Sequence, residues 1–499
     1  MTVKIKTRHL RTPFSFNDNT LVFSVLMLIT IARTVALFIT PLGLGVEEAQ
    51  YWLWSQNPSF GYFTKPPLIA WIIGFSHGVF GHYEWAVRLP ACWCHFAISV
   101  TLWKATEWLY GQKAGKIAAL LWISLPATAL GSFLISTDTP LLFCLSLAIL
   151  AISGAASLRI KNTQAMVLAG AAVGAGLLAK YAAIYMIFGL LLIWLSQPFQ
   201  TKLKITGVSL LIALIVTLIM VSPNLYWNLL NNFSTVRHLA HNANITSFNF
   251  NLYNTAEFLV GQIAVVGPIT FALMLSVVIF FIKNSHGRWL VCLAAPSIIV
   301  ITIQSLSSNA NANWAMASYP PLVVWLAGWL SEEKSLGNKI PQLIRYRLAM
   351  ITIILNFAIS LCFIVVSITG SLGIFAPKSD PLKRLRGWKN LAMDIRHELQ
   401  GYETNRIIAD RRNAAAILNW HFYKQKVKIM VHDHDGIPTN YFEANYGWDP
   451  QIGSKLLVLS DNKNPPQNLN IQWQGLPETS INKISDWDQR IYFIHRGIE

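Results

Sequence analysis

The sequence predicts a polytopic α-helical membrane protein with a small α/β domain at its C-terminal end, and three observations support this fold class. Hydrophobic residues make up 54% of the 499 residues and charged residues only 12%, about half the charged fraction of an ordinary soluble domain. The apolar residues gather in blocks long enough to cross a bilayer. From about Pro377 onward these blocks stop and charged residues become common.

Eleven apolar segments are predicted to cross the membrane, because their lengths approach the roughly 20 residues that a spanning helix needs. A shorter apolar segment, Leu68–Phe80, fits an interfacial or re-entrant helix better than a full crossing. The predicted spans are Leu21–Thr40, Ala86–Thr106, Ala114–Leu134, Pro140–Ser157, Met166–Ala179, Ala182–Ser196, Ile205–Val221, Phe258–Ile282, Trp289–Ser305, Ala315–Leu330 and Leu348–Gly370.

The net charge of +16 is distributed in a way that indicates a membrane topology and argues against a nucleic-acid partner. Lys and Arg gather at alternate span ends, which is the positive-inside pattern and predicts a cytoplasmic N-terminus. Eleven spans then place the C-terminal end on the outer side. The cations at the predicted inner ends include Lys4, Lys6, Arg8, Arg11, Lys104, Lys113, Lys116, Arg159, Lys161, Lys202, Lys204, Lys283, Arg288, Lys334, Lys339, Arg345 and Arg347.

The C-terminal region is predicted to form a separate α/β domain, with residues 1–375 as the membrane domain and residues 376–499 as the outer domain. Its sequence alternates between helical periodicity and short β-like runs. The predicted helices are Gly387–Gln400 and Asp410–Tyr423, and the predicted strands are Arg406–Ala409, Lys426–Val431, Lys455–Leu459 and Ile491–His495.

Several residues with reactive or metal-binding side chains have simpler interpretations. All five cysteines lie in predicted spans, so the sequence implies neither a disulfide framework nor a zinc finger. The run His432–Asp435 has metal-ligand residue types, but Gly436 follows it at once and we interpret it as a turn. Arg33, inside the first span, is expected to face the helix bundle and not the lipid.

The stretch that follows the first span has the most unusual composition in the chain. Two acidic residues come first, then several aromatic residues typical of a membrane interface, and then a lone lysine before two prolines. These residues are Glu47, Glu48, Tyr51, Trp54, Tyr62 and Lys65. Charges held at a membrane surface cost free energy unless something uses them, so the stretch predicts a functional site.

Further polar residues fall on the same predicted outer side. Asp138 precedes the fourth span and Lys180 follows the fifth, although a helix-capping Asp138 and a snorkelling Lys180 are the alternatives. The loop Ser222–Glu257, which contains Arg237, is longer than a simple connection needs, and this length favours a lid or a substrate-facing segment over plain polar surface. Asn313 lies in an amide-rich outer turn.

Cations and carboxylates on the outer side of a hydrophobic scaffold suit a substrate that is itself a lipid phosphate. Lys and Arg bind phosphate, and a carboxylate can act as a general base or orient an acceptor. A transporter or lipid flippase is the alternative from another class, but such proteins place charges near the bilayer midplane and often contain inverted repeats. Here the charges lie mostly at span ends and no repeat is found, so an enzyme is favoured.

Three stretches of the sequence resemble the bacterial protein-mannosyltransferase-like and aminoarabinose-transferase-like GT-C glycosyltransferases. They are Glu47–Gln56 (EEAQYWLWSQ), Gly61–Leu68 (GYFTKPPL) and Glu84–Pro90. Two further blocks, around Asp138 and Lys180, are similar to that family, as are weaker ones at Asn313-Trp314, Gly387-Trp388 and Ile408–Arg411. The resemblance extends over nearly the whole chain.

The resemblance implies a GT-C fold and inverting transfer of a sugar from a polyprenyl-phosphate-linked donor to an extracytoplasmic acceptor. It also implies a bacterial inner-membrane enzyme whose C-terminal domain faces the periplasm. The expected acceptor is a lipid or glycolipid, foremost lipid A or lipopolysaccharide core, and protein O-glycosylation is the alternative within the same fold. No cofactor is implied.

The resemblance also assigns roles to individual residues. Glu47 takes the place of the family's leading acid and Asp138 that of its second acid, so these two form the expected catalytic pair, with Glu48 beside them as a third candidate. Cations that would face the donor phosphate are Lys65, Lys180 and Arg237. Side chains expected to face substrate are Tyr51, Trp54, Tyr62 and Asn313.

Three departures from the family pattern limit what is carried over. The leading acid is usually Asp, whereas Glu47 is one methylene longer. Thr64 stands where aminoarabinose transferases have a metal-linked acid, so no metal site is carried over. Gln50 stands where that branch often has a cation, and this weakens a specific aminoarabinose assignment.

Overall fold

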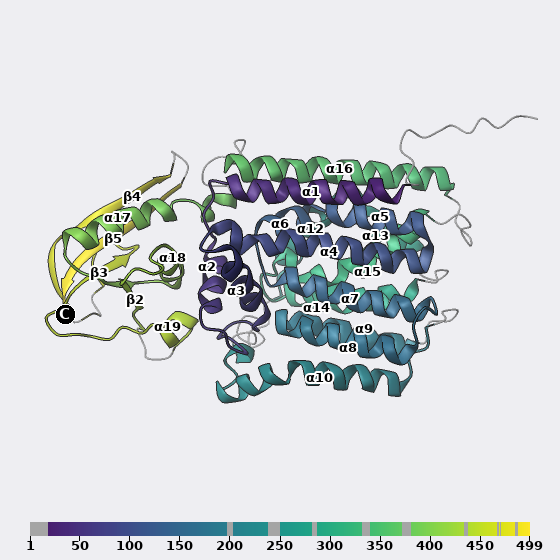
Figure 1. Cartoon of the computed structure of the whole chain (residues 1–499), viewed down its shortest axis with the longest axis horizontal. Helices are drawn as coiled ribbons and strands as arrows, with labels where there is room; N and C mark the ends of the chain where they lie inside the picture. Colours follow the sequence, from purple (N-terminus) through teal and green to yellow (C-terminus); the bar gives the residue numbers. More distant parts are fainter. Residues whose placement is uncertain are drawn as a thin grey trace, which may run out of the picture.

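The computed structural model describes residues 18–196, 203–237, 250–281, 287–331, 340–371, 381–433, 438–466, 469, 471–484 and 488–499. Most of the chain forms a bundle of roughly parallel and antiparallel helices, and a mixed α/β domain stands at one end of it (Figure 1). Two short helices, α2 (Val46–Ser55) and α3 (Leu68–Phe80), lie between the bundle and that domain. The segment expected to be interfacial or re-entrant is therefore the short helix α3.

Each of the eleven predicted spans coincides with a helix or with a bent pair of helices in the bundle. The helices are α1 (Asn19–Ile39), α4 (Glu84–Tyr110), α5 (Gln112–Ser124), α6 (Pro126–Phe133), α7 (Asp138–Ala156), α8 (Asn162–Ala179), α9 (Ile184–Ser196), α10 (Gly207–Leu230), α12 (Leu252–Val266), α13 (Pro268–Phe281), α14 (Arg288–Ser305), α15 (Tyr319–Ser331) and α16 (Gln342–Thr369). The polytopic helical fold is thus confirmed.

The described helices differ in how well each alone meets the length and hydropathy of a membrane span. Six unbroken helices meet them, namely α1, α7, α8, α10, α14 and α16. The pairs α5–α6 and α12–α13 meet them jointly and are bent by 56° and 110°, in each case where a proline begins the second helix because proline cannot continue the hydrogen-bond ladder. The count of eleven crossings therefore stays a prediction.

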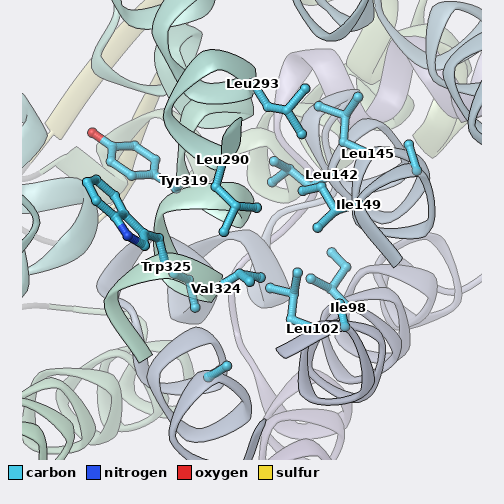
Figure 2. Packing of buried hydrophobic residues seen from close by; sticks show 14 of the residues in the cluster. Ile98, Leu102, Leu142, Leu145, Ile149, Leu290, Leu293, Tyr319, Val324 and Trp325 are labelled. Atoms are coloured by element: carbon cyan, nitrogen blue, oxygen red, sulfur yellow. The ribbon is translucent and has the colours of Figure 1, made fainter. Parts of the chain in front are cut away.

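The helices α4, α9 and α15 belong to the same bundle although they are short or carry charged residues (Figure 1). Figure 2 shows how Ile98 and Leu102 of α4 meet side chains of α7, α14 and α15 in a shared core. Nearly every side chain of α15 is buried. Such a helix is shielded from lipid by its neighbours, so its own hydropathy matters less.

Two sequence expectations about the bundle can be compared with the structure directly. Arg33 is buried and donates hydrogen bonds to Ser132 Oγ, to the carbonyl oxygen of Ile123 and to Ser360 Oγ, which confirms that it faces the bundle. The predicted bounds of the loop 222–257 are wrong at both ends, because α10 continues through Pro223 to Leu230 and α12 begins at Leu252. His238 and His241 of that loop lie outside the described residues.

The C-terminal domain contains a five-stranded mixed sheet in the order β2-β1-β3-β5-β4. Strand β1 pairs in parallel with β2 and β3, whereas β5 runs antiparallel to β3 and β4. The strands are β1 (Arg406–Ala409), β2 (Lys428–Val431), β3 (Lys455–Ser460), β4 (Gln472–Ile484) and β5 (Asp488–Ile498), and the helices are α17 (Trp388–Gly401), α18 (Arg412–His421) and α19 (Tyr441–Asn445). The sequence predicted β1, β2, β3, β5, α17 and α18 but not β4 or α19. Part of the run His432–Asp435 lies outside the described residues.

Helix α18 fastens the C-terminal domain to the bundle by packing against α2. The rings of Trp52 and Trp420 meet edge to face with centroids 4.9 Å apart, and His82 Nε2 lies 3.0 Å from the carbonyl oxygen of Trp420. Residues of both parts form one continuous hydrophobic cluster that includes Leu53, Ile73 and Leu418. The end of the bundle and the C-terminal domain are consequently held in a fixed relation.

Candidate active site

The polar residues expected to act together all lie at the end of the bundle that faces the C-terminal domain. Asp138 is the first residue of α7, and Lys180 directly follows the last residue of α8. Glu47 lies in the first turn of α2, and Lys65 in the loop before α3. Asn313 belongs to the short 3₁₀ helix η3 (Ala312–Ser318) between α14 and α15. The fold therefore joins residues from five separate parts of the chain.

Asp138 is the centre of a small hydrogen-bonded network. Its Oδ1 accepts a hydrogen bond from Lys180 Nζ at 2.7 Å, and its Oδ2 accepts one from Asn313 Nδ2 at 2.8 Å. The Lys180 and Asp138 side chains are 20% and 11% exposed, so the ion pair is partly shielded from water and stronger than a surface pair. The carboxylate therefore binds across to neighbouring elements and does not cap α7, as the alternative required.

Lys65 is mostly buried close to these charges. Burial lowers the pKa of its ammonium group, the neighbouring Lys180 lowers the pKa further, and Glu47 and Asp138 act in the opposite direction. The ammonium group makes no hydrogen bond or ion pair with any residue that the structure describes. A half-desolvated cation without a partner is disposed to bind an anion from outside the protein.

The loop that carries Lys65 is hydrogen-bonded to α10 and to the segment after it, and α10 is bonded in turn to the residue after Lys180. Asn224 donates from Nδ2 to the carbonyl oxygen of Phe60 at 2.7 Å, and Thr235 donates from Oγ1 to that of Tyr62 at 2.8 Å. The Tyr181 hydroxyl in turn donates to Asn224 Oδ1 at 2.8 Å. These bonds tie together the loop of Lys65 and the helix end of Lys180.

Glu47 lies at the open edge of the site, with its side chain 53% exposed. Its Oε1 accepts a hydrogen bond from Arg412 Nη2 at 2.8 Å, and the same guanidinium donates from Nη1 to Gln50 Oε1 at 3.2 Å. Tyr51 is buried beside them, and burial together with the charges of Glu47 and Asp138 raises the pKa of its hydroxyl. Tyr51 thus remains a neutral hydrogen-bonding group near both acids.

Glu48 faces the protein interior, in contrast to Glu47. Arg88 Nε donates to Glu48 Oε1 at 2.9 Å and Arg88 Nη2 to Oε2 at 2.6 Å, and both side chains are almost fully buried. The carboxylate also accepts hydrogen bonds from the backbone amides of Gly45 and Ile135. Since its oxygens are fully engaged, Glu48 holds α2 on α4 and does not fit the catalytic role expected for it.

Three other expected site residues take no part in the hydrogen-bonded network of Asp138 within the described part of the chain. Trp54 is fully buried and stacks on Tyr62 with ring centroids 4.8 Å apart, while Tyr441 of the C-terminal domain covers it. The Tyr62 hydroxyl donates to the carbonyl oxygen of Trp54 at 2.9 Å. These two aromatic side chains pack the domain junction and do not face substrate. Arg237 is exposed, and its side chain makes no hydrogen bond or ion pair with a residue that the structure describes.

Comparison with solved structures defines the class of protein to which this fold belongs. ArnT from Cupriavidus metallidurans, in the apo state and bound to undecaprenyl phosphate, superposes with a TM-score of 0.64 over 96% of this chain and 97% of that chain, at 13% sequence identity. The fold, with its helical bundle, two short helices at the end of the bundle and C-terminal α/β domain, is therefore that of a polytopic, ArnT-like membrane protein.

Sequence comparison specifies the family further. Residues 64–227 match the family described as dolichyl-phosphate-mannose-protein mannosyltransferase. The lipid A galacturonosyltransferase RgtD of Rhizobium johnstonii is 31% identical over 437 residues, which cover 87% of this chain and 89% of that protein. The chain belongs to this family of GT-C glycosyltransferases, as its motifs at Glu47, Lys65 and Asp138 led us to expect.

Arg412 is the residue at this site that sequence reasoning missed. It comes from the C-terminal domain, 365 residues away from its ion-pair partner Glu47 in the chain. Arg411 and Arg412 are adjacent and chemically identical, so no local pattern distinguishes the one that reaches the site.

Proposed function

We propose that this enzyme transfers a sugar from a polyprenyl-phosphate-linked donor to lipid A on the outer side of the bacterial inner membrane. The donor and the acceptor are supported by two relatives. The structurally similar ArnT has been solved with undecaprenyl phosphate, and RgtD is a lipid A galacturonosyltransferase. The observation that carries the proposal is the Lys65 ammonium, which pairs with no described residue, beside the Lys180–Asp138–Asn313 network at the end of the bundle that faces the C-terminal domain.

Lys65 and Lys180 are assigned to the donor phosphate. No described residue accepts an ammonium hydrogen of Lys65, and Lys180 has further hydrogens besides the one donated to Asp138. Asp138 and Asn313 hold the Lys180 side chain in place, so that its charge needs no reorientation when the donor binds. A charge-assisted hydrogen bond contributes about 1.5–3 kcal/mol, so two cations together form a specific binding site for the phosphate.

Transfer is assigned to a single displacement that inverts the sugar's anomeric centre. The acceptor oxygen forms a bond to the anomeric carbon while the bond from that carbon to the phosphate oxygen breaks, and the electron pair leaves with the polyprenyl phosphate. Lys65 and Lys180 stabilise the negative charge that grows on the leaving phosphate. A hydroxyl acceptor passes its proton to Glu47, whereas an acceptor phosphate is already ionised and needs no base.

No step is assigned to a metal ion. Within the described ranges, no three His, Cys, Asp or Glu side chains come together in a group that could hold one. Thr64, next to Lys65, replaces the acid that is linked to a metal in similar enzymes. Metal-independent transfer stays a prediction of the sequence. It is checked by measuring transfer in the presence of EDTA, where activity should persist.

Mass spectrometry of lipid A and of glycoproteins, from cells with and without the gene, tests the proposal. We expect one sugar to disappear from lipid A when the gene is deleted. The wild-type gene should restore this sugar, and a copy with Asp138→Asn, matched to wild type in membrane protein level by immunoblot, should not. Loss of the sugar from the glycoprotein fraction alone would show that the acceptor is protein. Unchanged glycosylation in both fractions would contradict the proposal.

A further inference from the structure

The C-terminal domain contributes one side chain to the candidate site. Arg412 is the first residue of α18, and its guanidinium group reaches back to the face of α2 that carries Glu47 and Gln50. These two residues are three apart in a helix and therefore lie on the same side of it. The planar guanidinium uses one nitrogen for each, which a lysine ammonium could not do with the same geometry.

Helix α18 holds Arg412 firmly at this position. Ala414 to Leu418 are all buried, and the rings of Trp420 and Trp52 pack against each other across the junction with α2. Both Arg412 and Glu47 nevertheless remain partly open to solvent, with side chains 39% and 53% exposed. The ion pair is thus held in place by the protein and remains accessible from solvent.

The contacts of Glu47 leave one of its two carboxylate oxygens available. Oε1 accepts from Arg412, whereas Oε2 makes no hydrogen bond with any described residue. An ionised carboxylate accepts hydrogen bonds at both oxygens. Binding at Oε1 therefore selects one side-chain orientation and directs the other oxygen to a second group.

We propose that Arg412 is a positioning residue for transfer, which orients the Glu47 carboxylate toward the acceptor and so makes the C-terminal domain part of the active site. The inference rests on the proposed function, in which Glu47 meets the acceptor. Long carboxylate side chains sample several rotamers, and holding one in the productive geometry lowers the barrier by removing that freedom beforehand. Arg412 acts through Glu47 and not on the donor phosphate, which Lys65 and Lys180 bind.

Arg411 provides a matched control. It is the neighbouring residue, of the same type and on the same domain, but its guanidinium pairs at 2.8 Å with Asp461 on the surface of that domain. Its side chain is 67% exposed. Removing Arg411 changes the charge of the protein by the same amount as removing Arg412 and leaves the Glu47 contact intact.

The test measures steady-state transfer by the full chain in nanodiscs, with a synthetic polyprenyl-phosphate sugar donor and lipid A as acceptor. The variants are Arg412→Ala, Arg412→Lys, Arg411→Ala, Glu47→Gln and the double variant Glu47→Gln/Arg412→Ala. We expect Arg412→Ala to lower kcat about tenfold or more while the donor KM stays within about twofold. Arg412→Lys should recover part of the loss, and Arg411→Ala should match wild type.

The double variant separates positioning from a structural effect. If Arg412 acts through Glu47, removing it in the Glu47→Gln background should cause no further loss, because the two changes remove one interaction. Additive losses, a raised donor KM with unchanged kcat, or equal behaviour of Arg412→Ala and wild type would each overturn the inference. A fully active Glu47→Gln would likewise overturn the inference, whereas a wild-type chain without transfer would instead overturn the proposed function.

Discussion

At the scale of single residues, Glu47 and Glu48 are neighbours in the chain with opposite surroundings. Glu47 is half exposed at the edge of the site, whereas Glu48 is buried in a two-pronged ion pair with Arg88. Successive residues of a helix point about 100° apart, so the two cannot both face the site squarely. The same substitution should therefore lower sugar transfer at Glu47 and protein stability at Glu48.

We predict that Glu47→Gln and Glu48→Gln fail for different reasons. Glu47→Gln should fold normally and lose transfer by about 10²-fold or more if the acceptor is a hydroxyl. Glu48→Gln should destabilise the protein by roughly 3–5 kcal/mol, because it leaves the Arg88 charge buried without its partner. Fluorescence-detected size-exclusion and thermal unfolding in detergent measure folding beside the transfer assay. A stable Glu48→Gln protein would show that Arg88 finds another partner.

Lys65 should give donor binding an unusual dependence on pH. Its pKa lies below that of an ordinary lysine because the side chain is buried and Lys180 is near. The ammonium form, which binds phosphate, is therefore lost as the pH rises through a value lower than usual. We predict that donor affinity falls on the alkaline side, and that Lys65→Arg moves this fall to higher pH because a guanidinium stays charged. If donor affinity fell at the same alkaline pH in wild type and Lys65→Arg, the assignment of Lys65 to the phosphate would be contradicted.

At the scale of elements, the loop 57–67 depends on close contact with α10. The backbone of this loop accepts hydrogen bonds from Asn224 and Thr235, and Gly61 lies against the α10 side chains. A Cβ atom at Gly61 would lie 2.6 Å from Trp227 Cδ2 and 3.0 Å from Asn224 Nδ2. The absence of a side chain at Gly61 is what lets Lys65 be held near Lys180.

We predict that Gly61→Ala weakens donor use by displacing this loop from α10. Overpacking of this kind costs about 1–3 kcal/mol, so the donor KM should rise while the bundle stays folded. Gly78→Ala is the control, because nothing lies within 4 Å of a Cβ at Gly78 in α3, and alanine favours a helix. Equal donor KM values for both variants would show that the loop does not depend on this contact.

The sequence predicted most elements because their signals are local. Apolar blocks identify the bundle helices, and short β-branched runs such as Arg406–Ala409 identify strands. Strand β4 escaped because its sequence contains Gly475 and Pro477 and is largely polar, and its pairing with β5 shifts register between Gln474 and Glu478. A strand of this kind is stabilised by its partner strand more than by its own composition.

The site was predictable only as far as its residues have distinctive neighbours. Asp138 and Lys180 are recognisable from their helix ends, and the structure joins them at 2.7 Å. Trp54 is of a residue type common at membrane interfaces, yet the C-terminal domain covers it. Both its burial and the contact of Arg412 with Glu47 arise from docking between distant parts of the chain, which no local pattern encodes.

At the scale of the whole molecule, the site residues share one end of the bundle with the C-terminal domain (Figure 1). The cation-rich ends, such as Lys104 to Lys116 at the junction of α4 and α5, lie at the other end. Cytoplasmic ends of membrane proteins are enriched in Lys and Arg. The site and the C-terminal domain are therefore expected to face the periplasm together.

Reporter fusions test this orientation. A fusion after residue 110 should report a cytoplasmic location and a fusion after residue 375 a periplasmic one. Alkaline phosphatase and green fluorescent protein, each fused at both positions, should give opposite signals and so control for each other. Fusions to single bundle helices are unsuitable as controls. A cytoplasmic signal after residue 375 would place the active site on the opposite side of the membrane from an outer-leaflet acceptor and so contradict the orientation.

The packing of α18 on α2 has a consequence for how the protein is made. The partners Glu47 and Arg412 are 365 residues apart, and a ribosome adds about 5–20 residues per second. The aromatic face of α2 therefore waits roughly 20–70 s at this rate before the segment that covers it has been synthesised and exported. During that interval Trp52 and Trp54 lack the part of their packing that Trp420 and Tyr441 supply, and a chain that ends before α18 never acquires it.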